Sequence, residues 1–133
     1  MFEMEIALLE PSTQKAHYSS MKIDDIYEYL SIEGHLTVRQ NKHIFFSEDI
    51  AAVELYWYIL KWYRAESIKR KLPFRYTTVE YVEPILSISY YHERYWKVDS
   101  PWIKSPATLV VEEHALESQV QKLICYLAEN LEL

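Results

Sequence analysis

The feature that most constrains this chain is a strict alternation of apolar and polar residues at positions 30 to 39, LSIEGHLTVR. Successive side chains of a β-strand point to opposite faces, so the pattern gives an extended segment one apolar and one polar face. Residues 40 to 43 follow as a turn, in which Asn41 can take the left-handed backbone conformation. Ile44 and Phe46 then resume the alternation. We therefore predict a β-hairpin with one buried face.

A second alternating stretch spans residues 85 to 100, ILSISYYHERYWKVDS, and predicts another hairpin with its turn at residues 92 to 94. Weaker strand patterns occur at residues 3 to 8, 75 to 82 and 107 to 112. These segments predict about five to seven strands, which we place in a single antiparallel sheet. The side chains expected to face the core in the second hairpin are Leu86, Ile88, Tyr90, Trp96 and Val98.

Gly34 is the only glycine of the chain, and it falls among the inward-facing positions of the first hairpin. A missing side chain at such a position permits a β-bulge or lets another element approach the backbone closely. We interpret it as a structural feature of the sheet.

Two helices are expected. The first begins after Ser47, an N-cap residue followed by Glu48 and Asp49 in the first turn, and ends in residues 67 to 71 before Pro73. The second spans residues 114 to 130 and is amphipathic. The pattern at residues 11 to 28 favours neither a helix nor a strand. The apolar stripe of the second helix consists of Leu116, Val120, Leu123, Ile124, Leu127 and Leu131.

The first helix is apolar around nearly its whole circumference, because Glu54 and Lys61 are the only charged residues between positions 50 and 63. Such a helix must be covered on more than one side. A curved sheet, a sheet together with the C-terminal helix, or a second protein chain would each cover it. We expect the following residues in the core: Trp57, Ile59, Leu60 and Trp62.

The fold class that follows is α+β, a single domain over residues 1–133 with the sheet packed against the aromatic-rich helix and the amphipathic C-terminal helix. The single cysteine, Cys125, cannot form an internal disulfide, and the acidic N-terminal segment is unlike a secretory signal. No stretch is apolar over about 20 residues, so we expect no membrane segment. A cytoplasmic protein is predicted.

The net charge is −6 and is unevenly distributed, with −6 over residues 1–60, +4 over residues 61–107 and −4 over residues 108–133. An acidic protein repels nucleic acid at long range, since phosphate binding needs clustered Lys and Arg. We therefore expect a protein partner, preferably a basic one, and neither nucleic acid nor membrane as a partner.

Recognisable catalytic and cofactor motifs are absent from the sequence. One glycine excludes glycine-rich phosphate loops and the GxSxG nucleophile elbow. The five histidines show no spacing typical of metal ligands, and Cys125 would need an orienting histidine that the sequence alone cannot place. We predict no catalytic residue, no cofactor and no metal, so an enzyme is the less favoured interpretation.

Two surfaces are candidates for partner binding. One is the polar strip of the first helix, whose other interpretation is a solvated edge. The second lies at the end of the second hairpin, where Trp102 either caps the core or anchors a partner and nearby acids add charge. The candidate partner-binding residues are Glu54, Tyr58, Lys61, Asp99, Trp102, Glu112 and Glu113.

The sequence supports two hypotheses about function. The first is a small acidic binding protein that holds a macromolecular, preferably basic partner without a chemical step; immunity proteins that neutralise bacterial toxins are an example of this class. A homodimer is also compatible with so many aromatic residues. The alternative is an α+β ligand-binding or enzymatic domain with an apolar pocket, which would be lined by Trp57, Tyr58 and Tyr90.

Overall fold

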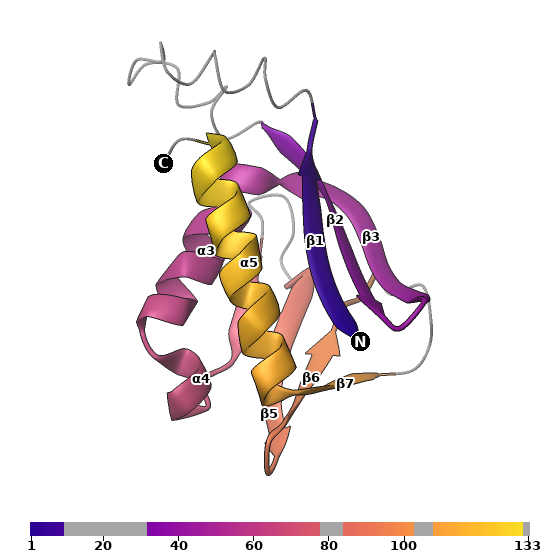
Figure 1. Cartoon of the computed structure of the whole chain (residues 1–133), viewed down its shortest axis with the longest axis vertical. Coiled ribbons are helices and arrows are strands. Elements are labelled where there is room, and N and C mark those ends of the chain that lie inside the picture. Colours follow the sequence, from indigo (N-terminus) through magenta and orange to yellow (C-terminus); the bar gives the residue numbers. More distant parts are fainter. Residues whose placement is uncertain (10–31, 78–83, 103–107, 132–133) are drawn as a thin grey trace.

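The computed structural model describes residues 1–9, 32–77, 84–102 and 108–131. Within these ranges the chain forms seven strands and three helices (Figure 1). The uncertain pattern at residues 11 to 28 and part of the expected strand at 75 to 82 lie outside them. The elements are, in order, β1 (Phe2–Leu8), β2 (Glu33–Gln40), β3 (His43–Ala51), α3 (Ala52–Arg64), α4 (Ser67–Arg70), β4 (Phe74–Tyr76), β5 (Leu86–His92), β6 (Tyr95–Asp99), β7 (Leu109–Glu112) and α5 (Glu113–Leu131).

The fold is α+β, as expected, but the strands form two antiparallel sheets and the prediction of a single sheet is wrong. The first sheet has the order β1-β2-β3 and the second the order β4-β5-β6-β7. The alternation of apolar and polar residues shows which face of a strand is buried. It does not show which strands pair with each other, because a strand with the same buried face can belong to either sheet.

The first hairpin is confirmed, with Asn41 in the left-handed conformation at φ 59°. Its return strand is longer than predicted, and Ser47 lies within β3 instead of capping a helix. Phe45 is the extra residue of a bulge, since Val38 pairs with Phe46 and Arg39 pairs with Ile44. The bulge reverses the alternation, which buries both phenylalanines and leaves Ile44 44% exposed.

Gly34 sits where another element comes close, which is the second of the two predicted roles. It pairs with Leu8 of β1 and is buried. A Cβ atom at this position would lie 2.8 Å from the Ile6 side chain and 3.2 Å from that of Leu8. The bulge lies elsewhere in the hairpin, so the glycine serves the packing of β1 on β2.

The aromatic-rich segment is two helices instead of one. The chain leaves α3 after Arg64, and Glu66 adopts a left-handed conformation that separates it from the four-residue α4. Lys71 is also left-handed and ends α4 before Pro73. The C-terminal helix is confirmed as α5, and all of its predicted stripe is buried except Ile124, which is half-buried. No helix in the described part of the chain is long and apolar enough to cross a bilayer.

The core lies between the two sheets and the long helices, and α5 packs against both α3 and β1 (Figure 1). Ile59, Leu60 and Trp62 are buried as predicted, but Trp57 is 51% exposed and its assignment to the core is wrong. The C-terminal helix α5 and the sheets, which cover α3, contact the side of α3 that carries Ile59 and Trp62. Trp57 falls on the remaining side, where the described residues leave it half in solvent.

Candidate functional site

An open groove of about 510 Å³ runs along the exposed side of α3. One wall is the helix itself, and the other is the segment from the end of α3 through α4 to β4. The side chains that matter for its chemistry are Trp57, Tyr58, Lys61, Leu72, Phe74 and Arg75. Three aromatic rings and a leucine make the surface largely apolar, while two cations supply charge.

The far wall of the groove is held by Trp62, a buried residue of α3. Its indole Nε1 donates a hydrogen bond of 2.9 Å to the carbonyl oxygen of Leu72. Its ring also packs on Phe74, with centroids 5.6 Å apart. A hydrogen bond and a ring contact from one side chain fix the segment before β4 against the helix, so the groove is a preformed feature.

The rim of the groove carries two exposed rings in defined positions. Tyr58 is 40% exposed and makes an edge contact with buried Tyr76, with ring centroids 5.5 Å apart. Trp57 makes an edge contact with Tyr56 at 5.4 Å. Each ring leans on a buried neighbour, and both present apolar surface to solvent. Burial, together with the charge of nearby Glu54, raises the pKa of the Tyr76 phenol far above its ordinary value, so this support stays uncharged.

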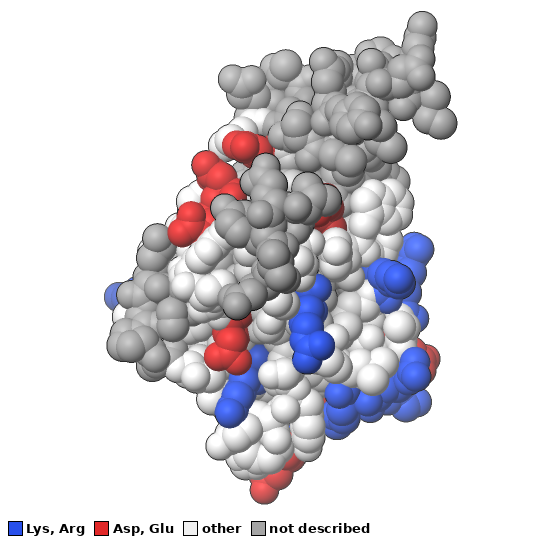
Figure 2. All heavy atoms as spheres, turned by 180° about the vertical axis from the view of Figure 1, so that it is seen from behind, with Lys and Arg blue, Asp and Glu red and all other residues white. Residues whose placement is uncertain are grey.

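The charge of this side of the molecule is positive, in contrast to the net charge of the protein. Figure 2 shows Lys and Arg side chains grouped around uncharged surface on this face, on the side where α3 and α4 lie. Lys61 and Arg75 line the groove itself, and no Asp or Glu does. Within the described residues neither cation has an ion-pair partner. The groove therefore combines an apolar surface with uncompensated positive charge.

The predicted partner-binding residues divide between several places. Tyr58 and Lys61 lie in the groove, and Glu54, one turn earlier on α3, is half-buried. Asp99 is exposed at the end of β6, outside the groove. Trp102 is half-buried and stacks on Phe46 with centroids 6.5 Å apart, so it covers an edge of the core. The structure thus brings together only the α3 part of the set.

Glu112 and Glu113 have structural contacts at the junction of β7 and α5. Glu112 accepts a hydrogen bond of 3.4 Å from the backbone nitrogen of Ala115. The Oε1 atom of Glu113 accepts hydrogen bonds from Lys71 Nζ at 2.8 Å and from the indole of buried Trp96 at 3.0 Å. Those two hydrogen bonds hold the pKa of Glu113 below its ordinary value, with Lys71 contributing most. Glu113 therefore ties α4 and β6 to the start of α5.

Glu113→Gln is expected to lower the free energy of unfolding by about 1 kcal/mol at neutral pH, because a charge-assisted hydrogen bond becomes a neutral one. A carboxyl with a lowered pKa stabilises the fold above its ordinary pKa, 4.5 for this group, and this contribution is lost as the pH falls through the lowered value. The difference between the two proteins should therefore shrink in acid. Urea unfolding at a series of pH values measures it.

Glu117→Gln is the matched control, since Glu117 lies one turn later on the same helix and its side chain has no hydrogen bond or ion pair within the described residues. Its stability should follow that of the wild type at every pH. An equal loss in both variants would contradict the role given to Glu113.

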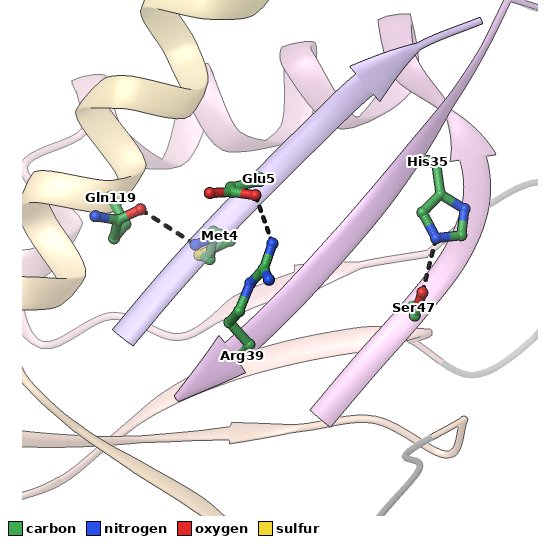
Figure 3. A network of polar contacts seen from close by, with 6 residues as sticks. All are labelled: Met4, Glu5, His35, Arg39, Ser47 and Gln119. Carbon is green, nitrogen blue, oxygen red and sulfur yellow. Dashed lines mark hydrogen bonds and ion pairs between the residues drawn. The ribbon is translucent and has the colours of Figure 1, made fainter. Parts of the chain in front are cut away.

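Sequence reasoning missed a polar trio on the outer face of the first sheet. His35 Nδ1 lies 2.7 Å from Asp49 Oδ1. His35 Nε2 lies 2.7 Å from Ser47 Oγ, a contact that Figure 3 shows. The order Asp–His–Ser is that of a catalytic triad. The trio nevertheless stands on an open sheet face, and none of its members lines the groove described above. His35 pairs with Asp49 across the hairpin, whose return strand extends to Ala51. A sequence prediction with a return strand of this length would have placed the two side chains next to each other.

The outer edge of β1 is covered by side chains of α5. Gln119 Oε1 accepts a hydrogen bond of 3.2 Å from the backbone nitrogen of Met4 (Figure 3). The Tyr126 hydroxyl oxygen accepts one of 3.5 Å from the backbone nitrogen of Leu8. On the outer face, Arg39 of β2 forms an ion pair with Glu5 at 2.6 Å. Because its outward amides are partly satisfied in this way, β1 is a poor template for an added strand.

No cluster of three or more metal-ligating side chains occurs in the part of the chain that the structure describes. Cys125 is free and exposed on α5. Among the described residues, Tyr90 does not line the groove that holds Trp57 and Tyr58. It packs on Trp96 with ring centroids 5.7 Å apart and donates a hydrogen bond to the Glu93 carbonyl. The groove along α3 is therefore the site that best fits the recognition of another molecule.

Comparison with known proteins gives one match. A family model described as "Domain of unknown function (DUF7878)" matches residues 2–133. Neither the curated proteins nor the solved structures contain a significant match to this chain.

Proposed function

The chain belongs to the DUF7878 family, and we propose that it is a binding protein that associates non-covalently with a protein partner and performs no chemical step. The observation that carries the proposal is the half-exposed Trp57 beside Tyr58 and Lys61 on a preformed groove. Tryptophan and tyrosine are enriched among the residues that dominate binding energy at protein interfaces. Rings that already lean on buried neighbours lose little conformational entropy when they bind.

The net charge of −6 supports a basic partner, since long-range attraction depends on total charge and accelerates encounter. A small acidic protein that sequesters a basic macromolecule corresponds to the immunity or inhibitor type. We also propose a cytoplasmic location, because a single cysteine is typical of reducing compartments.

Affinity capture from the native host tests this proposal, with the immobilised protein washed at low and at high salt. We expect a protein partner that is retained at low salt and released at high salt. In a titration with the purified partner, Trp57→Ala should weaken binding by about tenfold or more, as is typical of a central anchor. Its thermal stability should stay close to that of the wild type, because the ring is half in solvent.

The matched control is Tyr91→Ala, which removes another exposed ring, on β5 and outside the groove. It should bind like the wild type. Failure to retain any partner, or equal retention by the Trp57 variant, would contradict the proposal. Light scattering of the free protein tests whether a second copy of the chain is the partner.

A hydrolytic enzyme is the second candidate, and the specific observation in its favour is the Asp49–His35–Ser47 order with 2.7 Å contacts. An activated serine would react covalently with a fluorophosphonate probe. Labelling of Ser47 that disappears in His35→Ala would establish this second function and displace the first.

A further inference from the structure

We propose that the groove along α3 takes a segment of the protein partner in which an apolar side chain is flanked by carboxylates. This inference rests on the binding function proposed above and adds the chemistry of the bound segment. It concerns the residues Trp57, Tyr58, Lys61, Leu72, Phe74 and Arg75.

The apolar part of the segment follows from the groove surface. Trp57 and Leu72 are both exposed apolar side chains, and the buried Phe74 lines the same groove. A volume of about 510 Å³ lies within the roughly 300–1,000 Å³ of ordinary ligand sites, so it suits a few side chains and not a whole protein face. Burying one aromatic or branched aliphatic side chain there removes apolar surface of both molecules from water.

The acidic part follows from charge complementarity. Lys61 belongs to α3, and Arg75 is exposed on β4 between two buried neighbours, so each wall of the groove contributes one cation. With no acid in the lining and no ion-pair partner within the described residues, these charges are free to pair with carboxylates of a ligand. A basic segment would be repelled from the same place, even though the net charge of −6 attracts a basic partner at long range.

Single-stranded nucleic acid would also present negative charge and flat rings to this surface. Such ligands follow a basic groove over roughly 4–16 nucleotides. The acids elsewhere on a protein of net charge −6 repel a polyanion that extends beyond the groove. A peptide segment is short enough to confine its charge to the two cations, which favours a peptide over a nucleic acid.

A titration followed by ¹H–¹⁵N NMR tests the inference with a defined probe, a capped peptide with a central Phe-Leu pair and two glutamates on each side. We expect saturable shifts of the Trp57 indole and of the Lys61 and Arg75 amides, which weaken as salt is added. The same peptide with lysine in place of glutamate should cause no shifts there. Lys61→Glu combined with Arg75→Glu should weaken binding of the acidic peptide by about tenfold or more.

The matched control is Lys42→Glu combined with Lys122→Glu, which changes the net charge equally at two exposed lysines outside the groove. It should bind the acidic peptide within about twofold of the wild type, since distant surface charges are screened. Equal losses in both double variants would overturn the inference. So would tighter binding of a single-stranded oligothymidylate, or the absence of saturable shifts at millimolar peptide.

The two proposals fail separately. A captured partner that binds the Lys61→Glu/Arg75→Glu variant as well as the wild type would overturn the acidic-segment inference and leave the binding function standing. Circular dichroism of each variant confirms that it is folded before its binding is compared.

Discussion

Replacing Trp96 with alanine is expected to lower the free energy of unfolding by about 3 to 5 kcal/mol, the range for removing a large aromatic side chain from a packed core. Trp96 is fully buried on β6. Its ring makes edge contacts with Trp62 at 6.1 Å and Tyr90 at 5.7 Å. Its indole also donates a hydrogen bond to Glu113. The substitution therefore removes contacts among β5, β6, α3 and α5 at once.

Urea unfolding followed by far-ultraviolet circular dichroism measures the effect without relying on tryptophan fluorescence. Trp96→Phe keeps an aromatic ring but not the N–H donor, so it should lose clearly less stability than the alanine variant. Tyr95→Ala is the matched control, because Tyr95 is the preceding residue of the same strand and faces solvent. A small loss on Trp96→Ala, similar to that of the control, would refute the central position given to this ring.

The sequence predicts this part of the fold well because its signals are local. The alternation at residues 85 to 98 identifies the strands β5 and β6, their buried side and the turn between them. Tyr90 is the exception, because it is expected to face the core but is 37% exposed, where the register of β5 and β6 shifts between Tyr90 and His92. The same holds for α5, where the apolar stripe marks the buried face. Periodicity depends only on neighbouring residues, so a single sequence is enough to read it.

The assignment of strands to sheets depends on long-range packing and could not be read from the sequence. A strand with one buried face, such as β4, fits the pattern of either sheet. Only its pairing with β5 shows that it belongs to the second sheet. The extra residue Phe45 hides the second half of β3, since the bulge shifts the alternation by one position. The apparent N-cap at Ser47 then suggested a helix four residues too early, before its true start at Ala52.

The candidate site was predicted in part. The narrow polar strip that Tyr58 and Lys61 share with Glu54 on α3 predicts a recognition surface, and the structure places Tyr58 and Lys61 in the groove. The sequence predicts Trp57 in the core, because an almost wholly apolar helix gives no signal for the side that stays uncovered. Arg75 joins the groove from β4, far along the chain, and its nearness to α3 is a product of the tertiary fold.

Gly34→Val is expected to lower the free energy of unfolding by about 1 to 3 kcal/mol, the usual cost of forcing extra methyl groups into a packed region. A Cβ at this position already lies 2.8 Å and 2.9 Å from two carbons of Ile6. Gly34 does not have a positive φ, so the loss would come from overlap and not from backbone strain. Valine has a higher β-strand propensity than glycine, so propensity alone would predict a gain in stability.

A double-mutant cycle with Ile6→Ala identifies the overlap as the cause. Truncating Ile6 removes both of the carbons that a side chain at position 34 would meet first, so Gly34→Val should cost less in that background than in the wild type. Gly34→Ala should cost less than valine in either background, since the end of the Ile6 side chain can move by rotation. If the stability losses of Gly34→Val and Ile6→Ala were strictly additive, the destabilisation would not come from overlap with the Ile6 side chain. A stabilised Gly34→Val variant would mean that β1 has room to move away from β2.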